Sequence, residues 1–197
     1  MTSHPDKNAP TFQGETMNAI IDNICSRRSI RKYKPDMLPK ETIEEIIRAG
    51  TYAASGMGTQ GSIIVAATNK ELRDRLSRMN LKAGNEVYNY GWKEGFDPFY
   101  GAPVVLTVLA DRSNFTYVYD GSLVMGNLML AASSLRVGSC WIHRAKEVFD
   151  TPEGKEILAS LGIRGDYEGI GFCILGYPEG SQPRAPRRKE NRVFFAE

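Results

Sequence analysis

Residues 121–135 read GSLVMGNLMLAASSL, and this apolar stretch decides which folds are open to the chain. Its length and composition predict one helix, with apolar residues on almost every side. A helix without a polar face has to lie at the centre of a large core or in a contact between subunits. The stretch therefore predicts a central helix that is buried by its own chain or by a partner subunit.

Short apolar runs, most of them rich in β-branched residues, lie on both sides of this helix. Residues 103–110 precede it, residues 137–142 follow it, and residues 62–68 and 170–176 are similar in composition. Each run predicts a buried strand. Because helices and strands alternate along the chain, the fold class is α/β or α+β, with a central sheet flanked by helices. The other predicted helices span residues 17–26, 42–52, 71–79 and 153–161.

The length and composition of the chain limit the number of domains that it can form. The chain has 197 residues, of which 42% are apolar, and this suits one compact domain. Residues 1–14 are polar, so we expect a flexible N-terminal tail. Residues 15–197 are expected to form a single domain. From residue 177 the chain is rich in Pro and Arg, which predicts an extended C-terminal arm.

The overall composition excludes several classes of protein. The 25 Lys and Arg residues oppose 23 Asp and Glu residues, so neither nucleic acid nor a membrane surface is expected as a partner. No apolar run approaches the length of a membrane span. The three cysteines lack metal-like spacing and favour a reducing, cytoplasmic location. With two histidines, neither a multi-histidine metal site nor a Ser-His-Asp hydrolase is expected.

Positive charge is concentrated in two short segments. Residues 27–33 read RRSIRKY, and residues 184–189 read RAPRRK. A guanidinium presents a planar fork of donors that matches phosphate oxygens, and a serine hydroxyl adds a neutral hydrogen bond. The two segments could converge on one small dianion. The alternative for the first segment is a solvated basic helix end, whose cations complement the helix dipole.

The glycine-rich residues 56–61 read GMGTQG and satisfy G-x-G-x-x-G letter for letter. A dinucleotide fingerprint needs this string after a strand and at the start of a helix. Here a predicted helix precedes it and a predicted strand follows it, so we reject a dinucleotide-binding fold. The glycines instead predict positive φ angles or a close approach of the backbone to another group.

Several short segments form an ordered set of motifs. They are RRSIRKY at 27–33, AASGMGTQGS at 53–62, NLMLAA at 127–132, GSCWI at 138–142, LGYP at 175–178 and RRK at 187–189. The first resembles the N-terminal R-[RH]-S-x-R-x-[FY] signature of the nitroreductase family, the FMN-dependent NAD(P)H oxidoreductases. The others are similar, in the same order, to the family's A-P-S-x-x-N-x-Q-P-W, N-L-x-L-A-A, G-x-G-S-x-W-I, L-G-Y-P and C-terminal basic pair.

This resemblance implies an α+β, nitroreductase-like three-layer fold, with a central mixed or antiparallel sheet flanked by helices, and an intertwined homodimer. Residues 15–197 would form one FMN-binding domain. In the family each flavin site is built from both chains at the dimer interface. The apolar helix of residues 121–135 would be the long interface helix.

The resemblance also implies which residues bind the cofactor. The first basic segment and the C-terminal arginines would hold the phosphate, and residues 141–144 would lie along the isoalloxazine, with a backbone N–H near His143 or Arg144 meeting N5. The implied residues are Arg27, Arg28, Ser29 and Arg31 at the phosphate and ribityl chain, Arg187 and Arg188 at the same phosphate, Ala54, Ser55, Gly56, Gly58 and Gln60 at the partner's flavin, and Trp141, Ile142, His143 and Arg144 along the ring.

Three positions depart from the family pattern. Gly58 stands where the family has an asparagine that contacts the ring, and Gly61 with Ser62 replaces Pro-Trp, so the pocket floor is expected to be more open. The family's lysine at the N1/O2 edge of the ring has no clear counterpart. Lys82 and Lys93 are candidates, and either could equally be a solvated surface lysine.

The implied activity is that of an FMN-dependent oxidoreductase. It would take hydride from NADH or NADPH and pass electrons to an electron-poor small molecule, such as a nitroaromatic or a quinone, in a ping-pong cycle. A flavin performs this chemistry itself, so no side chain is assigned as catalytic. His143 could donate a proton, or could be an ordinary packed or surface histidine.

Alternatives stay open on the acceptor and on turnover. An enone, an iodinated aromatic or free flavin could replace the nitroaromatic. Aromatic residues between Tyr88 and Tyr100 could cap the ring and select the acceptor, or fill space beneath a long loop. A rival from another class is a flavin-binding carrier or sensor with little turnover. A nucleic-acid-binding protein that uses the same arginines is disfavoured by the near-zero net charge.

Overall fold

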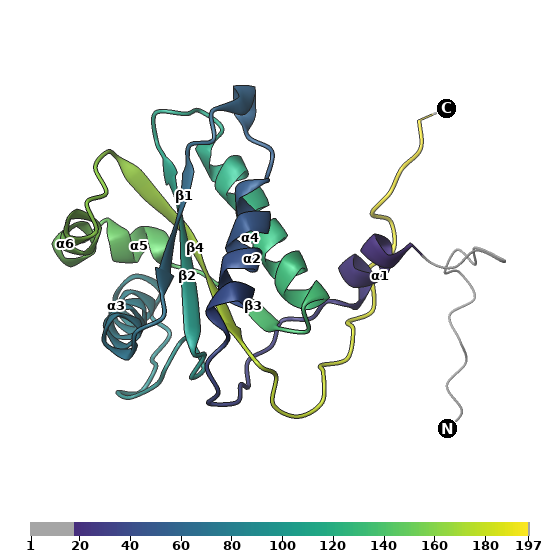
Figure 1. The fold of residues 1–197 in the computed structure, drawn as a ribbon, viewed down its shortest axis with the longest axis horizontal. Coiled ribbons are helices and arrows are strands. Elements are labelled where there is room, and N and C mark those ends of the chain that lie inside the picture. Colours follow the sequence, from purple (N-terminus) through teal and green to yellow (C-terminus); the bar gives the residue numbers. More distant parts are fainter. Residues whose placement is uncertain (1–17, 197) are drawn as a thin grey trace.

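An antiparallel sheet forms the centre of the protein (Figure 1). The computed structural model describes residues 18–196, and within them four strands run in the order β1-β2-β4-β3. Each neighbouring pair is antiparallel. The tail predicted for residues 1–14 lies outside the described residues. The strands are β1 Ser62–Ala67, β2 Val104–Asp111, β3 Gly138–Ile142 and β4 Tyr167–Gly176.

Helices cover both faces of the sheet. The helices α3 (Lys70–Tyr88), α5 (Ala145–Phe149) and α6 (Pro152–Ser160) lie on one face, and α2 (Lys40–Thr51) and α4 (Tyr117–Ser134) lie on the other. Because side chains alternate along a strand, the sheet contributes to two separate apolar cores, one under each helical layer. The predicted α+β class and three-layer arrangement are confirmed.

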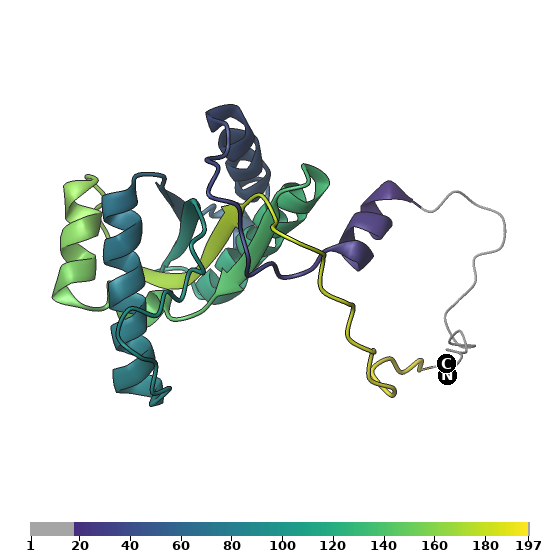
Figure 2. The same ribbon diagram turned by 90° about the horizontal axis from the view of Figure 1, so that it is seen from below.

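The helix α1 (Ala19–Ser26) and the C-terminal arm lie together at one side of the layered body (Figure 2). The amide of Asn23 donates to the Leu130 carbonyl of α4 at 2.9 Å. The arm follows β4 and is tied to the end of α1, where the side chain of Gln182 donates to the Ser26 carbonyl at 2.9 Å. Beyond this contact the arm extends away from the body.

The helix α4 is buried on one face and open on the other. On the side that faces the sheet, Val124 is 7% exposed and Leu128 is fully buried. On the opposite side, Tyr119 is 71% exposed and Leu123 is 50% exposed. The central helix predicted from residues 121–135 is therefore present, but residues 18–196 leave part of its apolar surface exposed.

The structure differs from the sequence-based prediction in α3 and α5. A helix predicted to end near residue 79 continues to Tyr88 and passes through Gly84, where a Cβ would lie 2.6 Å from the ring of Trp92. Asn89, with φ of 52°, then ends the helix in the left-handed region. The helix α5 has five residues, which is too short to give a periodic signal.

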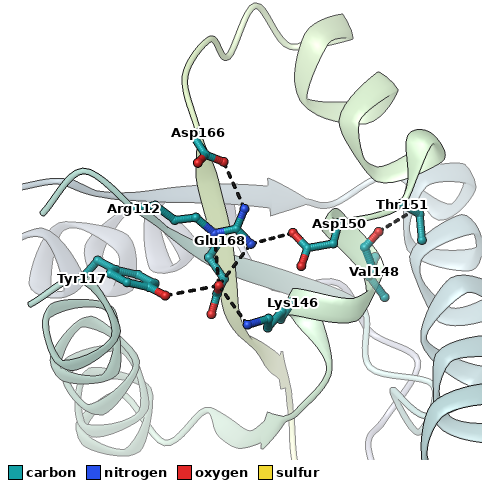
Figure 3. Close-up of polar contacts among 8 residues, drawn as sticks. All are labelled: Arg112, Tyr117, Lys146, Val148, Asp150, Thr151, Asp166 and Glu168. Atoms are coloured by element: carbon teal, nitrogen blue, oxygen red, sulfur yellow. Dashed lines mark hydrogen bonds and ion pairs between the residues drawn. The ribbon is translucent and has the colours of Figure 1, made fainter. Parts of the chain in front are cut away.

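A polar network fixes α5 to the sheet (Figure 3). Glu168 of β4 is 7% exposed, and its Oε2 lies 3.1 Å from both Arg112 Nη2 and Lys146 Nζ. Arg112 also pairs with Asp150, at the C-terminal end of α5, at 2.7 Å. These cations offset the cost of burying a carboxylate. The network therefore fixes α5, and with it the turn that precedes α5.

Candidate functional site

The basic segment after α1 runs along the outer edge of β3. The Ile30 N–H donates to the Ser139 carbonyl at 2.9 Å, and Ser29 forms an isolated parallel bridge with Ser139. At the other end of the segment, the buried Tyr33 hydroxyl donates to the Ile30 carbonyl at 2.6 Å, and burial raises the pKa of Tyr33. Backbone hydrogen bonds and apolar contacts thus hold the segment along β3. Most of its Arg and Lys side chains are therefore not needed to hold it there.

Arg27, Ser29 and Arg31 all act on the pKa of the Cys140 thiol in β3. Burial raises the pKa of the Cys140 thiol, whereas the charge of Arg31, a hydrogen bond with Ser29 and the charge of Arg27 act in the opposite direction. Of the three residues, Arg27 lines the pocket beside β3, and Ser29 bridges to Ser139 through the backbone.

Arg27 has a buried donor without an acceptor. Its Nη1 has no hydrogen-bond partner among the described residues. Such an atom is costly unless a ligand satisfies it. Arg27 and Arg28 line a pocket of about 330 Å³, which is completed by Gly138 and Ser139 of β3 and by Gln182 of the arm. The donors and the volume fit a phosphate group with its adjoining chain.

Arg28 has a different role from Arg27. Its Nη1 donates to the carbonyls of Cys25 and Arg27, both at 2.7 Å. These carbonyls lie at the C-terminal end of α1, where a helix leaves acceptors without internal partners. Arg28 thus caps α1, as the alternative interpretation of the basic segment expects. The one segment therefore contains both a helix-capping arginine and an arginine with a free buried donor.

Residues 141–144 continue from β3. Ile142 is 7% exposed, so its side chain belongs to the core and only its backbone is available. Trp141 packs partly buried against the core on the other face of the sheet. Because the Ser139 carbonyl points away from β4, the alternation of the ladder turns the N–H group of Trp141 outward as well. The outer edge of β3 therefore offers a backbone donor beside the basic segment.

Arg144 is buried, whereas the neighbouring His143 is exposed. Arg144 is 6% exposed and has φ of 77°, and its Nη2 donates to Asn80 Oδ1 at 2.8 Å. Asn80, on α3, donates in turn to the His143 carbonyl at 2.9 Å. The turn between β3 and α5 is therefore fixed from α3. We call Arg27, Ser29 and Arg31 with this β3 edge the basic half-site.

A second group of predicted residues lies in the loop of residues 53–61, which we call the loop half-site. The Gly56 N–H donates to Asp120 Oδ1 at 3.0 Å. A Cβ at Gly56 would lie 2.2 Å from Thr116 Oγ1. Thr116 itself donates to the other oxygen of Asp120 at 2.9 Å. These contacts confirm the predicted close approach of the backbone at this glycine.

The rest of the loop half-site shows the predicted positive φ angles. They are 69° at Gly58 and 50° at Gln60, whose N–H donates to Ser55 Oγ at 3.0 Å. Ala54, Ser55 and Gln60 line a pocket of about 310 Å³ that also touches α2, β1 and α4. The loop follows α2 and precedes β1, so the rejection of a dinucleotide fingerprint is confirmed.

One chain does not bring the two half-sites together. The loop half-site contacts Thr116 and Asp120 at the start of α4, whereas the basic half-site shares its pocket with Ser133, at the end of α4. An 18-residue helix is about 27 Å long. Arg187 and Arg188 are also exposed on the arm, and Arg187 pairs with Glu190 at 3.0 Å.

Sequence reasoning missed Asn80 and Asp120, the two residues that fix these half-sites. Asn80 is fully buried and Asp120 is 5% exposed. Both lie on helices, where a polar letter normally predicts the solvent-facing side. Asp120 could have been noticed in the sequence, because it is an acidic residue in the first turn of a helix that has no other charged residue.

The two candidate lysines, Lys82 and Lys93, are both exposed. Lys82 lies 3.9 Å from Glu86, and Lys93 lies in the loop after α3.

Among the described residues, no cluster of three or more His, Cys, Asp or Glu side chains is arranged to hold a metal ion. None of the helices described is long and apolar enough to cross a bilayer.

Comparison with known proteins identifies the family. The model of the nitroreductase family matches residues 24–177. The NADPH-flavin oxidoreductase of Vibrio harveyi is 29% identical over 184 residues, covering 87% of this chain and 70% of the relative. A Bacteroides fragilis nitroreductase solved with bound FMN superimposes with a TM-score of 0.81 at 28% identity, covering 91% of this chain and 100% of that one. An FMN-bound nitroreductase of Desulfitobacterium hafniense gives 0.81 at 25% identity, with 92% and 100% covered. The chain belongs to the nitroreductase family.

Proposed function

We propose that the protein is an FMN-dependent oxidoreductase that passes hydride from NADH or NADPH to an electron-poor small molecule. The observation that carries the proposal is the buried Nη1 of Arg27, which has no acceptor among the described residues, on a residue that lines the pocket beside β3. A phosphate in this pocket would satisfy the donor. The FMN-bound structures of family members support this assignment.

The chain's own residues would bind and orient the cofactor. Arg27, Ser29 and Arg31 would hold its phosphate and ribityl hydroxyls, and Arg187 and Arg188 are candidates for the same phosphate. The outward N–H of β3 would hold the edge of the ring through a hydrogen bond. FMN supplies the hydride-accepting chemistry when bound, so the protein needs no side chain as general base.

We infer that the protein works as a homodimer. The outward face of α4 combines the exposed Tyr119 and Leu123 with Gly126, where an added Cβ would meet no atom within 4 Å. An exposed apolar helix face that includes a glycine suits close packing against a second copy. The arm also ends in exposed apolar residues, with Phe194 at 81% and Phe195 at 87%.

A two-fold dimer also explains why the two half-sites lie apart in one chain. If two α4 helices pack in antiparallel orientation, the start of one lies beside the end of the other. The loop half-site of one chain then faces the basic half-site of its partner. We propose that each FMN is bound between them, with the ring against the partner's residues 54–60.

Anaerobic reduction of the purified protein tests the proposed function. We expect a yellow protein that NADH or NADPH bleaches and that a nitroaromatic or a quinone reoxidises. Both half-reactions at catalytic rates support a ping-pong oxidoreductase. Bound flavin that no nicotinamide reduces would favour the carrier or sensor instead. A colourless protein that does not bind added FMN would contradict both.

A further inference from the structure

The pocket of the loop half-site, of about 310 Å³, contains a hydroxyl without a hydrogen-bond partner. The Ser62 Oγ, at the start of β1, is buried and has no partner among the described residues. Other hydroxyls of the pocket wall have partners. The Thr51 hydroxyl donates to the Arg48 carbonyl at 2.7 Å, and the Ser55 hydroxyl accepts from the Gln60 N–H at 3.0 Å. A buried polar group without a partner is costly, so Ser62 marks a point at which a ligand can form a hydrogen bond.

The backbone beside Ser62 is fixed, so the space next to this small side chain is part of the fold. The Asp111 N–H donates to the Gly61 carbonyl at 3.0 Å, and a Cβ on Gly61 would collide with the Asn114 side chain. Ser62 itself pairs with Ala110 at the start of the β1–β2 ladder. The family motif has tryptophan at position 62, and a side chain of that size would fill much of such a space. Serine leaves the space open.

The wall of this pocket is apolar and carries no positive charge. Ile47 of α2, Ile64 of β1 and Val124 of α4 contribute aliphatic surface, and Asp120 contributes a carboxylate. Among the described residues that line the pocket, none is Lys, Arg or His. Apolar walls with a few placed polar groups are typical of sites for small organic molecules. An anion would be repelled by Asp120 and would lose its hydration without gaining a cation, so the pocket fits a neutral ligand.

The pocket beside β3 has the opposite character. Its wall includes Arg27, Arg28 and Arg136, and none of the described residues that line it is Asp or Glu. The two pockets have similar volumes, about 310 and about 330 Å³, and differ in charge. One therefore suits a phosphate, and the other suits a neutral molecule.

The neutral pocket adjoins the place of the flavin ring. Ala54, Ser55 and Gln60 line it, and under the proposed function, on which this inference rests, the same residues lie against the ring. We propose that the pocket binds the electron acceptor as a neutral aromatic ring, and that the Ser62 hydroxyl donates to a nitro or carbonyl oxygen of this ring. The small side chain at position 62 then sets the size of the acceptor, and Asp120 excludes acceptors that carry a negative charge.

Calorimetric titration of the oxidised, FMN-loaded protein with 4-nitrobenzamide and 4-nitrobenzoate tests the inference without turnover. The two probes have nearly the same shape and differ by one negative charge. We expect 4-nitrobenzamide to bind, and 4-nitrobenzoate to bind about tenfold more weakly. Ser62→Ala removes the hydroxyl and should weaken the binding of 4-nitrobenzamide about fivefold. Ser62→Trp fills the space and should weaken it about 30-fold.

Ala66→Trp is the matched control for Ser62→Trp. Ala66 lies on the same face of β1 as Ser62, because side chains alternate along a strand, and it is exposed outside the pocket. The added ring should leave the affinity for 4-nitrobenzamide within about twofold of the wild type. If Ser62→Trp does not fold, Ile47→Phe narrows the same space from α2 and should weaken the binding about tenfold.

Three results would overturn the inference and leave the proposed function intact. A wild-type protein that binds FMN but not 4-nitrobenzamide is the result expected if a side chain of a second copy fills the pocket. Equal affinities of the wild type and the pocket-filling variants would place the acceptor elsewhere. Equal affinities for the two probes would contradict the preference for a neutral ring. Failure of the wild-type protein to bind FMN would overturn the proposed function itself.

Discussion

The basic half-site and the loop half-site are built in opposite ways. In the basic half-site the backbone is held along β3, and a side-chain donor of Arg27 is left without an acceptor. In the loop half-site the polar groups satisfy one another, since Gly56, Thr116 and Asp120 form a closed set of hydrogen bonds and close contacts. The first therefore has unused binding capacity for an anion, and the second offers a fixed backbone shape.

Under the proposed function, this difference predicts that the basic half-site supplies most of the affinity for FMN and that the loop half-site supplies shape. Charge-assisted hydrogen bonds to phosphate are strong, so their loss releases the ligand. A preformed loop contributes through its surface, so small displacements weaken binding by smaller factors. Variants in the two half-sites should accordingly differ in the size of their effects on FMN affinity.

The largest expected effect comes from the basic half-site. Arg27→Ala combined with Arg31→Ala removes two cations and should weaken FMN binding about 1,000-fold, or about 4 kcal/mol. Fluorescence titration with FMN measures the change. Lys32→Ala is the matched control, because Lys32 is exposed and pairs with Glu179 at 3.2 Å. Equal effects of the control and the double variant would contradict the assignment of the phosphate.

The next effect is expected from the outward face of α4. Leu123→Arg should weaken the dimer and FMN binding together, each about 100-fold, because an unpaired charge is buried in the contact. Sedimentation with a flavin absorbance readout follows both. Leu161→Arg is the control, since Leu161 is 51% exposed and Leu123 is 50% exposed. A Leu123→Arg monomer that keeps full FMN affinity would contradict the two-chain site.

A smaller effect is expected from steric change in the loop half-site. Gly56→Ala places a methyl group 2.2 Å from Thr116 Oγ1 and should weaken FMN binding about tenfold. Gly58→Ala is a control in the same loop. Nothing lies within 4 Å of its added Cβ, so only its φ of 69° is unfavourable. Calorimetric titration should show a clearly smaller loss for Gly58→Ala than for Gly56→Ala.

The smallest effect is expected at Asp120. Asp120→Asn keeps an acceptor for the Gly56 N–H but replaces the oxygen that accepts from Thr116. One charge-assisted hydrogen bond is weakened, so FMN affinity should fall about fivefold, with a loss of about 1 kcal/mol in the free energy of unfolding. Chemical denaturation of the apoprotein separates these two quantities. A change in stability alone would limit Asp120 to a structural role.

Most of the fold follows from the sequence pattern. The strands β1, β2 and β3 match the apolar runs predicted for them within two residues at each end. The sequence pattern fails to predict helix ends that depend on a contact between residues far from one another in the helix and loop. Near the end of α3, Trp92 packs where Gly84 lacks a side chain, and Asn89 then ends the helix in the left-handed region. A single-sequence pattern contains no information on that contact.

The sequence names candidate residues for the site but contains no information on their geometry. The motifs put Arg28 close to the phosphate that Arg27 would hold, and in the structure Arg28 caps α1, because the helix ends one residue before Arg27. The buried Asn80 and Asp120 resemble ordinary polar helix residues in the sequence. The cofactor-binding residues and the cytoplasmic location stay predictions.

Mixed dimers test the two-chain site most directly. One parent carries Arg27→Ala with Arg31→Ala, and the other carries Gly56→Val, which enlarges the clash with Thr116. At an FMN concentration at which neither parent binds, mixing and subunit exchange should restore binding at about a quarter of all sites, because each heterodimer contains one intact site. No restored flavin absorbance in the mixture, despite heterodimers detected by mass, would contradict the account.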